Sequence, residues 1–478
     1  MGSSARLGLL GLAVTVQIFT SCAAADPVAV SFRVVTSPDD DPLRGATSLR
    51  VVVSRVDVEI AATEVPIAAG LPTVPEAPFG TDYRLRVEAR DRSVVLARGS
   101  SFPFDVDLDG AIPAPRVLIG RVGRFAPVPA VPATTRPDGA VVAALATVSG
   151  ALLVTELGTV YVYRQHPSPP SQDALEVLAH LPSRERATWC VLPGPRLLGV
   201  GGAVAGATVL DENGAVLVTS VDPGLVAHRD GAALIALEGD APVALALGGA
   251  PAALEPPSAA VTRLELLADD TLEVRPLPLA ALPTACAHAR AALVHVDVGG
   301  VAEQRVVLAG GVGALGATGV AALVDPSGRA ASSEVALGSS LRSSIVVGLS
   351  SRLVLVAGGA TDAGVPSDVA HLLSADSSGL SVVAPPPHPL YVARVGAASL
   401  KLAEGLVLVV GGTGTAGAPL TAAELVRVDL ETFPGAALPT GSLPWPQSAP
   451  QLVVLGDGSV LSADATGLAF YIPPVALR

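Results

Sequence analysis

Three aspartates in the segment 105–110 have the spacing of metal ligands. Asp105, Asp107 and Asp109 alternate with apolar residues before a glycine, as in the first half of a calcium loop, where hard oxygen ligands converge on one ion. The second half of such a loop is missing, because Arg116 occupies its twelfth position and two prolines interrupt the segment. The same pattern predicts a β-strand whose apolar residues face a core and whose carboxylates face water. We favour the strand, and calcium binding at these aspartates stays open.

Catalytic motifs with recognisable spacing are missing from the sequence. It contains no G-x-S-x-G elbow, no H-E-x-x-H pair and no phosphate-binding loop. The seven histidines are scattered singly, as is typical of buried or exposed side chains without a metal; they include His166, His228, His288, His295 and His371. The sequence therefore predicts no catalytic residue, no cofactor and no metal site.

The first residues are typical of an export signal. Arg6 supplies a positive charge, and residues 7–19 form an apolar run followed by small side chains. This run is too short to span a bilayer stably. The sequence Phe19-Thr20-Ser21-Cys22 resembles a bacterial lipobox, although Phe19 stands where leucine is usual. The resemblance implies that residues 1–21 are a signal peptide and that Cys22 becomes the lipidated N-terminus.

A second cleavage site competes with this one. The three alanines that end at Ala25 form an A-x-A-like site, and cleavage there would release a protein that begins at Asp26. Both alternatives place the mature protein outside the cytoplasm. Lipidation at Cys22, followed by Ala23, implies an outer-membrane or cell-surface lipoprotein, whereas cleavage after Ala25 implies a periplasmic or secreted protein.

Two further cysteines, Cys190 and Cys286, form an even pair. An oxidising compartment permits a disulfide between them, and burial as two small apolar thiols is the alternative. The sequence alone does not decide between these states.

The composition indicates a folded chain with many small strands. Half of the 478 residues are hydrophobic, 15% are charged and only 3% are aromatic. The formal net charge is −13, and lysines and arginines do not cluster. Because a nucleic-acid groove needs clustered positive charge to neutralise phosphates, we exclude nucleic acid as a partner.

Residues 22–113 have the pattern of a small all-β domain. Short alternating strands are predicted at 28–35, 49–53, 83–89 and 94–98, with turn-rich pieces between them. From Tyr83 to Ala89 one face is apolar and the other charged, as a sheet packed on one side requires. We expect an antiparallel, Ig-like β-sandwich here.

Repeats dominate the rest of the chain. Five apolar stretches run into double glycines, roughly 47 to 62 residues apart, and such periods are typical of propeller blades. Weaker copies at 152–155 and 459–464 extend the series to seven blades. The double glycines are 201–202, 248–249, 310–311, 358–359 and 411–412.

One unit carries a family resemblance. The stretches 394–400, 406–412 and 423–429, followed by Phe433, resemble in order the strands of a Kelch repeat. The outer strands lack the family's usual Tyr and Trp. The resemblance implies that residues 114–478 form a Kelch-like β-propeller.

The ring needs a closing strand. The last unit, which ends near Tyr471, has three predicted strands and no fourth, whereas segment 117–125 has a strand pattern ahead of the first blade. We expect strand 117–125 to complete the last blade, because closure removes two exposed sheet edges.

These features favour a binding or scaffold protein without enzymatic activity. Loops on one face of the propeller would hold a protein or a glycan at the cell envelope, and the lipid on Cys22 would be the only contact with the membrane. The alternative is a polysaccharide hydrolase or lyase whose residues converge only in three dimensions. Paired acids around the channel mouth would favour that alternative.

Overall fold

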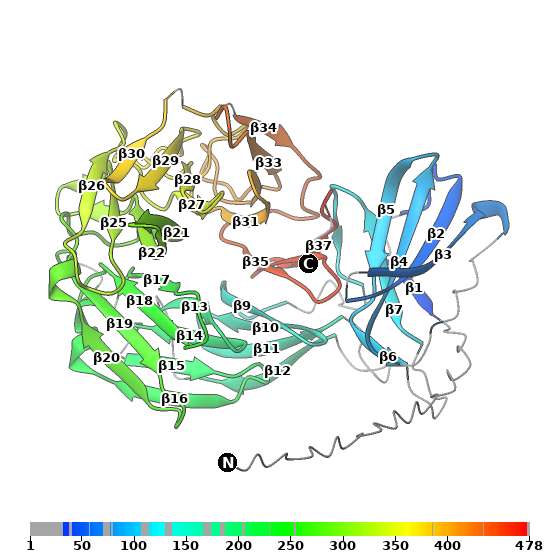
Figure 1. Cartoon of the computed structure of the whole chain (residues 1–478), viewed down its shortest axis with the longest axis horizontal. Coiled ribbons are helices and arrows are strands. Elements are labelled where there is room, and N and C mark those ends of the chain that lie inside the picture. Colours follow the sequence, from blue (N-terminus) through cyan, green and yellow to red (C-terminus); the bar gives the residue numbers. More distant parts are fainter. Residues whose placement is uncertain are drawn as a thin grey trace, which may run out of the picture.

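The chain forms two all-β units, a curled N-terminal sheet and a closed ring of seven four-stranded sheets (Figure 1). The all-β class and the seven-bladed propeller predicted from the repeats are therefore confirmed. In this computed structural model the described residues are 32–37, 41–56, 58–69, 77, 80–106, 114–129, 136–165, 174–181, 187–202, 206–228, 230–252, 255–384, 386–433 and 435–475.

Each blade is an antiparallel sheet, and in blades 1 to 6 the first strand in the chain lies at the centre of the ring, whereas in blade 7 the inner strand is β35 and β8 is outermost (Figure 1). These inner strands contact one another all the way round, from β9 to β35 and back. Blades 1 to 3 are β9 (Val141–Thr147), β10 (Gly150–Thr155), β11 (Thr159–Arg164) and β12 (Leu175–His180); β13 (Thr188–Leu192), β14 (Arg196–Val200), β15 (Gly206–Leu210) and β16 (Val216–Val221); and β17 (Ala233–Ala236), β18 (Val243–Leu247), β19 (Val261–Leu266) and β20 (Leu272–Pro276). Blades 4 and 5 are β21 (Arg290–Val298), β22 (Val301–Ala309), β25 (Val320–Val324) and β26 (Ser333–Ala336); and β27 (Ile345–Gly348), β28 (Leu353–Ala357), β29 (Ala370–Asp376) and β30 (Gly379–Val382). Blades 6 and 7 are β31 (Ala398–Ala403), β32 (Leu406–Val410), β33 (Ala423–Val428) and β34 (Gly435–Pro439); and β35 (Gln451–Val454), β36 (Val460–Asp464), β37 (Gly467–Tyr471) and β8 (Phe125–Pro127).

The double glycines follow the second strands of blades 2 to 6, where both residues adopt left-handed torsions. At Gly411 and Gly412 φ is 62° and 93°, a region that residues with a side chain rarely adopt. A Cβ on Gly411 would lie 2.7 Å from the Gln447 carbonyl oxygen at the start of blade 7. The Gly412 N–H donates to that oxygen at 3.0 Å. The motif therefore turns the chain and ties adjacent blades together.

The N-terminal unit is one mixed sheet. Strand β1 runs parallel to β7 and pairs Arg33 with Arg116, whereas the other pairs are antiparallel. This differs from the antiparallel sandwich expected from the sequence, because strand direction here depends on a pairing between distant segments. The strands are β1 (Arg33–Thr36), β2 (Ser48–Arg55), β3 (Val58–Pro66), β4 (Gly80–Asp91), β5 (Val94–Ser100), β6 (Phe104–Val106) and β7 (Arg116–Arg121).

The core of this sheet follows the predicted alternation. In β4, Tyr83, Leu85 and Val87 are fully buried on one face. The sheet curls, so that Val117 and Ile119 of β7 join the same buried cluster. Strand β7 thus belongs to the N-terminal core.

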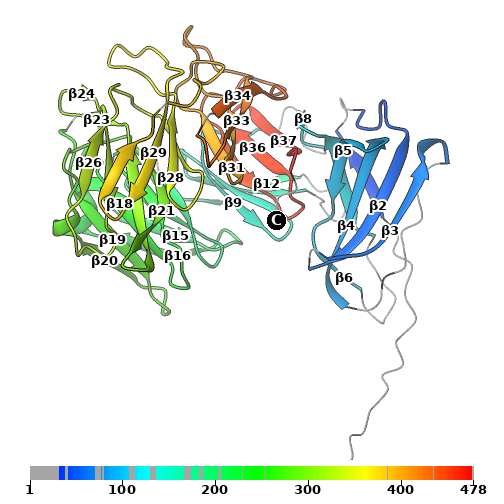
Figure 2. The same ribbon diagram turned by 45° about the horizontal axis from the view of Figure 1, so that its top comes forward.

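The predicted strand 117–125 is divided in two by the structure. Its first part is β7, which pairs with β1 and β5 in the N-terminal sheet. The chain then turns at Gly123, where φ is 72°, and only β8 pairs with β37 to complete blade 7 (Figure 2). A single extended strand cannot serve both sheets, and the glycine allows the change of direction. The last blade is therefore closed from the N-terminal side, by residues 125–127.

The N-terminal sheet packs against this closure. Arg84 Nη1 donates to the Gly456 carbonyl at 2.5 Å, and Arg98 Nη2 donates to the Pro473 carbonyl at 2.6 Å. Both acceptors belong to blade 7 or its C-terminal extension. A small buried cluster also spans the two units: Leu118, Ala126, Phe470 and Ile472.

Helical structure is confined to three short 3₁₀ turns in the described residues, η1 (Ile67–Ala69), η2 (Pro223–His228) and η3 (Pro278–Ala280). Within the described part of the chain, no helix has the length and apolar character needed to cross a bilayer.

Candidate functional site

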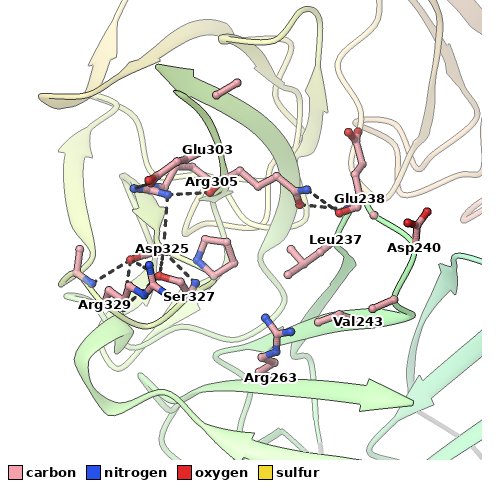
Figure 3. Close-up of a pocket in the computed structure, with 16 residues that line it drawn as sticks. Leu237, Glu238, Asp240, Val243, Arg263, Glu303, Arg305, Asp325, Ser327 and Arg329 are labelled. Carbon is pink, nitrogen blue, oxygen red and sulfur yellow. Dashed lines mark hydrogen bonds and ion pairs between the residues drawn. The ribbon is translucent and has the colours of Figure 1, made fainter. Parts of the chain in front are cut away.

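A cavity of about 610 Å³ lies between blades 3 and 4 and is called here the interblade cleft (Figure 3). One wall is the loop between β17 and β18. The other is the start of β22 together with the loop between β25 and β26. The charged residues that line it are Glu238, Asp240, Arg263, Glu303, Arg305, Asp325 and Arg329.

An elongated hairpin builds the cleft. Strands β21 and β22 have nine residues each, whereas β17 and β18 of the neighbouring blade have four and five. The extra length carries residues 303–305 beyond the packed part of the blade, where they line the cavity. Sequence reasoning missed these residues. The available signal was the longest spacing between double glycines, which falls at this blade.

Arg305 is fixed on one wall between two carboxylates. Its guanidinium lies 2.7 Å from Glu303 and 3.6 Å from Asp325. Asp325 also accepts hydrogen bonds from the Ser327 hydroxyl at 2.8 Å and the Ala330 N–H at 2.9 Å. Burial raises the pKa of Asp325, but the hydrogen bonds from Ser327 and the charge of Arg305 outweigh it, so its pKa lies below the ordinary value. Asp325 is therefore a fixed anion and a poor general acid.

The opposite wall is tied to the hairpin by an amide. Gln304 Nε2 donates to the Glu238 carbonyl at 2.6 Å, and its Oε1 accepts the Glu238 N–H at 3.1 Å. The Glu238 carboxylate also lies 3.3 Å from His295 Nε2 on β21. These contacts fix the spacing of the two walls, because each joins the β17–β18 loop to the long hairpin.

Two opposite charges in the cleft have no partner of their own. Among the described residues, neither the Arg329 guanidinium nor the Asp240 carboxylate makes a hydrogen bond or ion pair, and both are exposed. Figure 3 shows Arg329 and Arg305 on one side of the cavity and Asp240 and Glu238 on the other. The cleft therefore offers a ligand one unpaired cation, Arg329, on one wall and one unpaired anion, Asp240, on the other.

The tip of the long hairpin adds an apolar surface. Val298 is 38% exposed and Val301 62% exposed, on either side of the Gly299–Gly300 turn. Of the described residues that line the cleft itself, none is aromatic. A sugar ring would thus find no flat apolar face to stack on, whereas a protein surface can use both the valines and the charges.

A carboxyl with a raised pKa could act as a general acid. The one described carboxyl with a raised pKa is Asp457, where burial outweighs the hydrogen bonds from Ser459 and Gln165. Asp457 lines none of the described cavities. A glycosidase pair needs a protonated acid beside the scissile bond, and Asp457 is not placed to supply it at these cavities. The described residues also contain no group of three or more His, Cys, Asp or Glu side chains arranged to hold a metal ion.

Two predicted histidines have structural roles. His228 is buried in blade 3, where its Nδ1 lies 2.6 Å from the Gly248 carbonyl and its Nε2 lies 2.9 Å from the Thr262 hydroxyl. Burial lowers its pKa, so the neutral ring donates to Gly248 and accepts from Thr262. His371 Nε2 contacts the Ser339 hydroxyl at 2.8 Å, and burial lowers its pKa too. His228 therefore has no ring nitrogen left for a metal ion.

The cysteines of the propeller are free thiols. Cys190 lies on β13 and Cys286 just before β21, and burial raises the pKa of both to about 12. Both are therefore protonated and unreactive at neutral pH. Cys22 and His166 lie outside the described residues.

The aspartate segment is described only in part. Asp105 lies on β6 with its carboxylate exposed, and it accepts the Asp82 N–H at 3.1 Å. The neighbouring Val106 is buried, as the strand alternative requires. Asp107 and Asp109 lie outside the described residues, so calcium binding there stays a prediction from the sequence.

Comparison with known proteins does not place the chain in a family. A scan against protein-family models finds no match, and a search of curated proteins finds none.

Proposed function

We propose that this protein is a non-enzymatic binding protein of the cell envelope and that the interblade cleft holds a segment of a partner protein. The observation that carries the proposal is the unpaired Arg329 facing the unpaired Asp240 across the cleft. Such groups are open to pairing with charges of a partner. The exposed Val298 and Val301 supply the apolar centre that protein interfaces need beside a polar rim.

The envelope location rests on the sequence. The apolar run before Cys22 and the lipobox-like residues 19–22 favour lipidation and anchoring. The blade built around residues 394–433 resembles a Kelch repeat, and propellers of that kind present loops on a rigid ring. A lipid at the N-terminus would then hold the propeller and its cleft outside the cytoplasm.

A protein partner fits the cleft better than a glycan. The cleft has charges of both signs and lacks an aromatic stacking platform among its described residues. Polysaccharide cleavage, the alternative function, needs a protonated acid at a cavity, and Asp325 in the cleft is held ionised. The ionised state of Asp325 supports binding without turnover as the proposal.

Site-specific crosslinking tests the proposal. A photo-crosslinking amino acid at Val301, in cells that produce the protein, should give a discrete protein adduct. The charge reversal Arg329→Glu should lower its yield at least fivefold, because it replaces the unpaired cation of the cleft with an anion. Arg427→Glu, which reverses an exposed arginine on β33 of blade 6, should leave the yield unchanged.

The controls separate the alternatives. The same crosslinker at Val221, 74% exposed on the edge of blade 2, should give no such adduct. Equal adducts from both positions would contradict a specific site. Formation of new reducing or unsaturated ends when the purified protein is incubated with envelope polysaccharide would favour the hydrolase or lyase.

A further inference from the structure

The centre of the propeller holds a second cavity system, separate from the cleft. Two cavities of about 340 and 220 Å³ are lined by the inner strands of the blades and the residues beside them. They share Arg290, Ala291, Ala449 and Gln451, so they form one channel mouth. Arg290 lies at the opposite end of β21 from Val298, roughly 26 Å away along an extended strand.

Arg290 is the only charged residue among the first residues of the seven inner strands. The corresponding residues of the other blades are neutral: Val141, Thr188, Ala233, Ile345, Ala398 and Gln451. No carboxylate lines either cavity in the described residues. The channel therefore carries one positive charge in a ring of neutral side chains.

The Arg290 guanidinium has no partner in the described part of the chain. It makes no hydrogen bond or ion pair there, and the residue is exposed to the channel. The protein around it still lowers its pKa by desolvation, and no nearby carboxylate opposes that change. An arginine nevertheless stays charged at neutral pH. A charge that is partly desolvated and uncompensated is stabilised when an anion binds.

Polar groups surround this charge. His288 lines the channel and has a left-handed backbone conformation, with φ of 56°. Its backbone N–H donates to the Gly231 carbonyl at 2.6 Å. Its ring lies directly over Gly231, where a Cβ would be 2.6 Å from Nδ1. Ser343 and Gln451 add a hydroxyl and an amide to the same lining. These groups can bind the hydroxyls of a small polar ligand.

We propose that the channel mouth binds a small hydroxylated carboxylate, of the size of a uronic acid, through Arg290. The planar guanidinium matches a carboxylate with two parallel hydrogen bonds. A single cation suits a singly charged carboxylate better than a doubly charged phosphate. The combined cavities are large enough for one sugar ring. This site is independent of the interblade cleft and of any protein partner.

Calorimetric titration of the full chain with D-glucuronate tests the site. D-Glucose is the matched ligand without a carboxylate, and inorganic phosphate is the competing oxyanion. We expect binding of glucuronate alone. Arg290→Gln should weaken it at least tenfold, and glutamine fits this position because Gln451 occupies it in blade 7. Arg329→Gln, which changes the unpaired arginine of the cleft, should leave glucuronate affinity unchanged.

A second variant protects the test against a folding defect. Gln451→Glu keeps Arg290 and places a carboxylate on the lining of the same cavities. It should weaken glucuronate at least fivefold while the melting temperature stays close to that of the parent. Absence of glucuronate binding by the folded parent chain would overturn the proposal. So would preference for phosphate, or equal affinity in the parent and Arg290→Gln.

Discussion

Arg394 and Glu424 form an ion pair that is completely enclosed within blade 6, with side chains 0% and 1% exposed. Arg394 also donates to the carbonyls of Gly411 at 2.9 Å and Ala422 at 3.0 Å. The other oxygen of Glu424 accepts the Tyr391 N–H at 2.6 Å. Burial lowers the pKa of Arg394, and Glu424 opposes that change. The pair closes the end of the blade at its double glycine.

Blade 3 uses a neutral pair for the same purpose. His228 contacts the carbonyl of Gly248, the first of its double glycine, and Thr262, the second residue of β19. Glu424 is likewise the second residue of β33. Blades 3 and 6 thus use the second residue of the third strand for a buried polar contact with a residue before the blade, although the residue types differ.

Breaking the ion pair should be costly. Arg394→Met leaves Glu424 buried without its partner and should lower the free energy of unfolding by about 3 to 5 kcal/mol. The double variant Arg394→Met with Glu424→Leu should recover much of this loss, because no unpaired charge remains. Urea unfolding measures both. Arg427→Met, an exposed neighbour on β33, is the control, and a loss below about 1 kcal/mol for Arg394→Met would contradict a structural role.

Asp457 should make stability depend on pH across the ring seam. It accepts Gln165 Nε2 at 2.6 Å, joining blade 7 to blade 1, and burial raises its pKa. With the pKa raised in the fold, its contribution is fully present below the unfolded value of about 3.8 and is lost as pH rises through the folded value. Asp457→Asn should therefore stabilise the protein at pH 7. The side-chain amide of the new asparagine can also donate a hydrogen bond to Gln165 Oε1, which lacks a partner in the parent protein.

Chemical unfolding at several pH values checks this prediction. The gain from Asp457→Asn should shrink as pH falls toward about 4. Asp376→Asn is the control, because Asp376 is exposed and hydrogen bonds from Ser378 lower its pKa. A gain for Asp457→Asn that is the same at every pH would show that its ionisation is not the cause.

Strand β8 should be essential for closing the propeller. The Phe125 ring lies 4.7 Å from that of Tyr471, centre to centre, and is almost fully buried. Phe125→Ala should cost about 3 to 5 kcal/mol, the usual range for a buried phenylalanine, and should lower the melting temperature of the propeller. Phe104→Ala, in the N-terminal sheet, is the matched control. If both variants affect unfolding of the propeller equally, β8 does not act as the closing strand.

Processing at Cys22 can be tested in cells. If this cysteine carries the lipid, Cys22→Ala should move the protein from the membrane fraction to the soluble fraction. Cys190→Ala should leave it in the membrane fraction. Mass spectrometry that finds an unmodified chain starting at Asp26 would contradict lipidation.

The sequence was sufficient to predict the all-β class and the number of blades. Both follow from local requirements that each repeat must meet on its own. The paired left-handed torsions at Gly411 and Gly412, for example, need residues without a Cβ wherever a second strand ends. Such a requirement places glycines at a regular spacing in the sequence. This spacing can be recognised without knowledge of any neighbouring blade.

Only the tertiary structure decided the division of segment 117–125 and the composition of the two sites. The apolar pattern of β7 fits either sheet, and pairing with β1 and β5 selects the N-terminal one. Arg329 and Asp240 face each other because two blades pack side by side. Likewise, Arg290 stands out because its neighbours in the ring, contributed by strands far apart in the chain, carry no opposite charge. A missing partner is a property of the whole ring, and no single repeat encodes it.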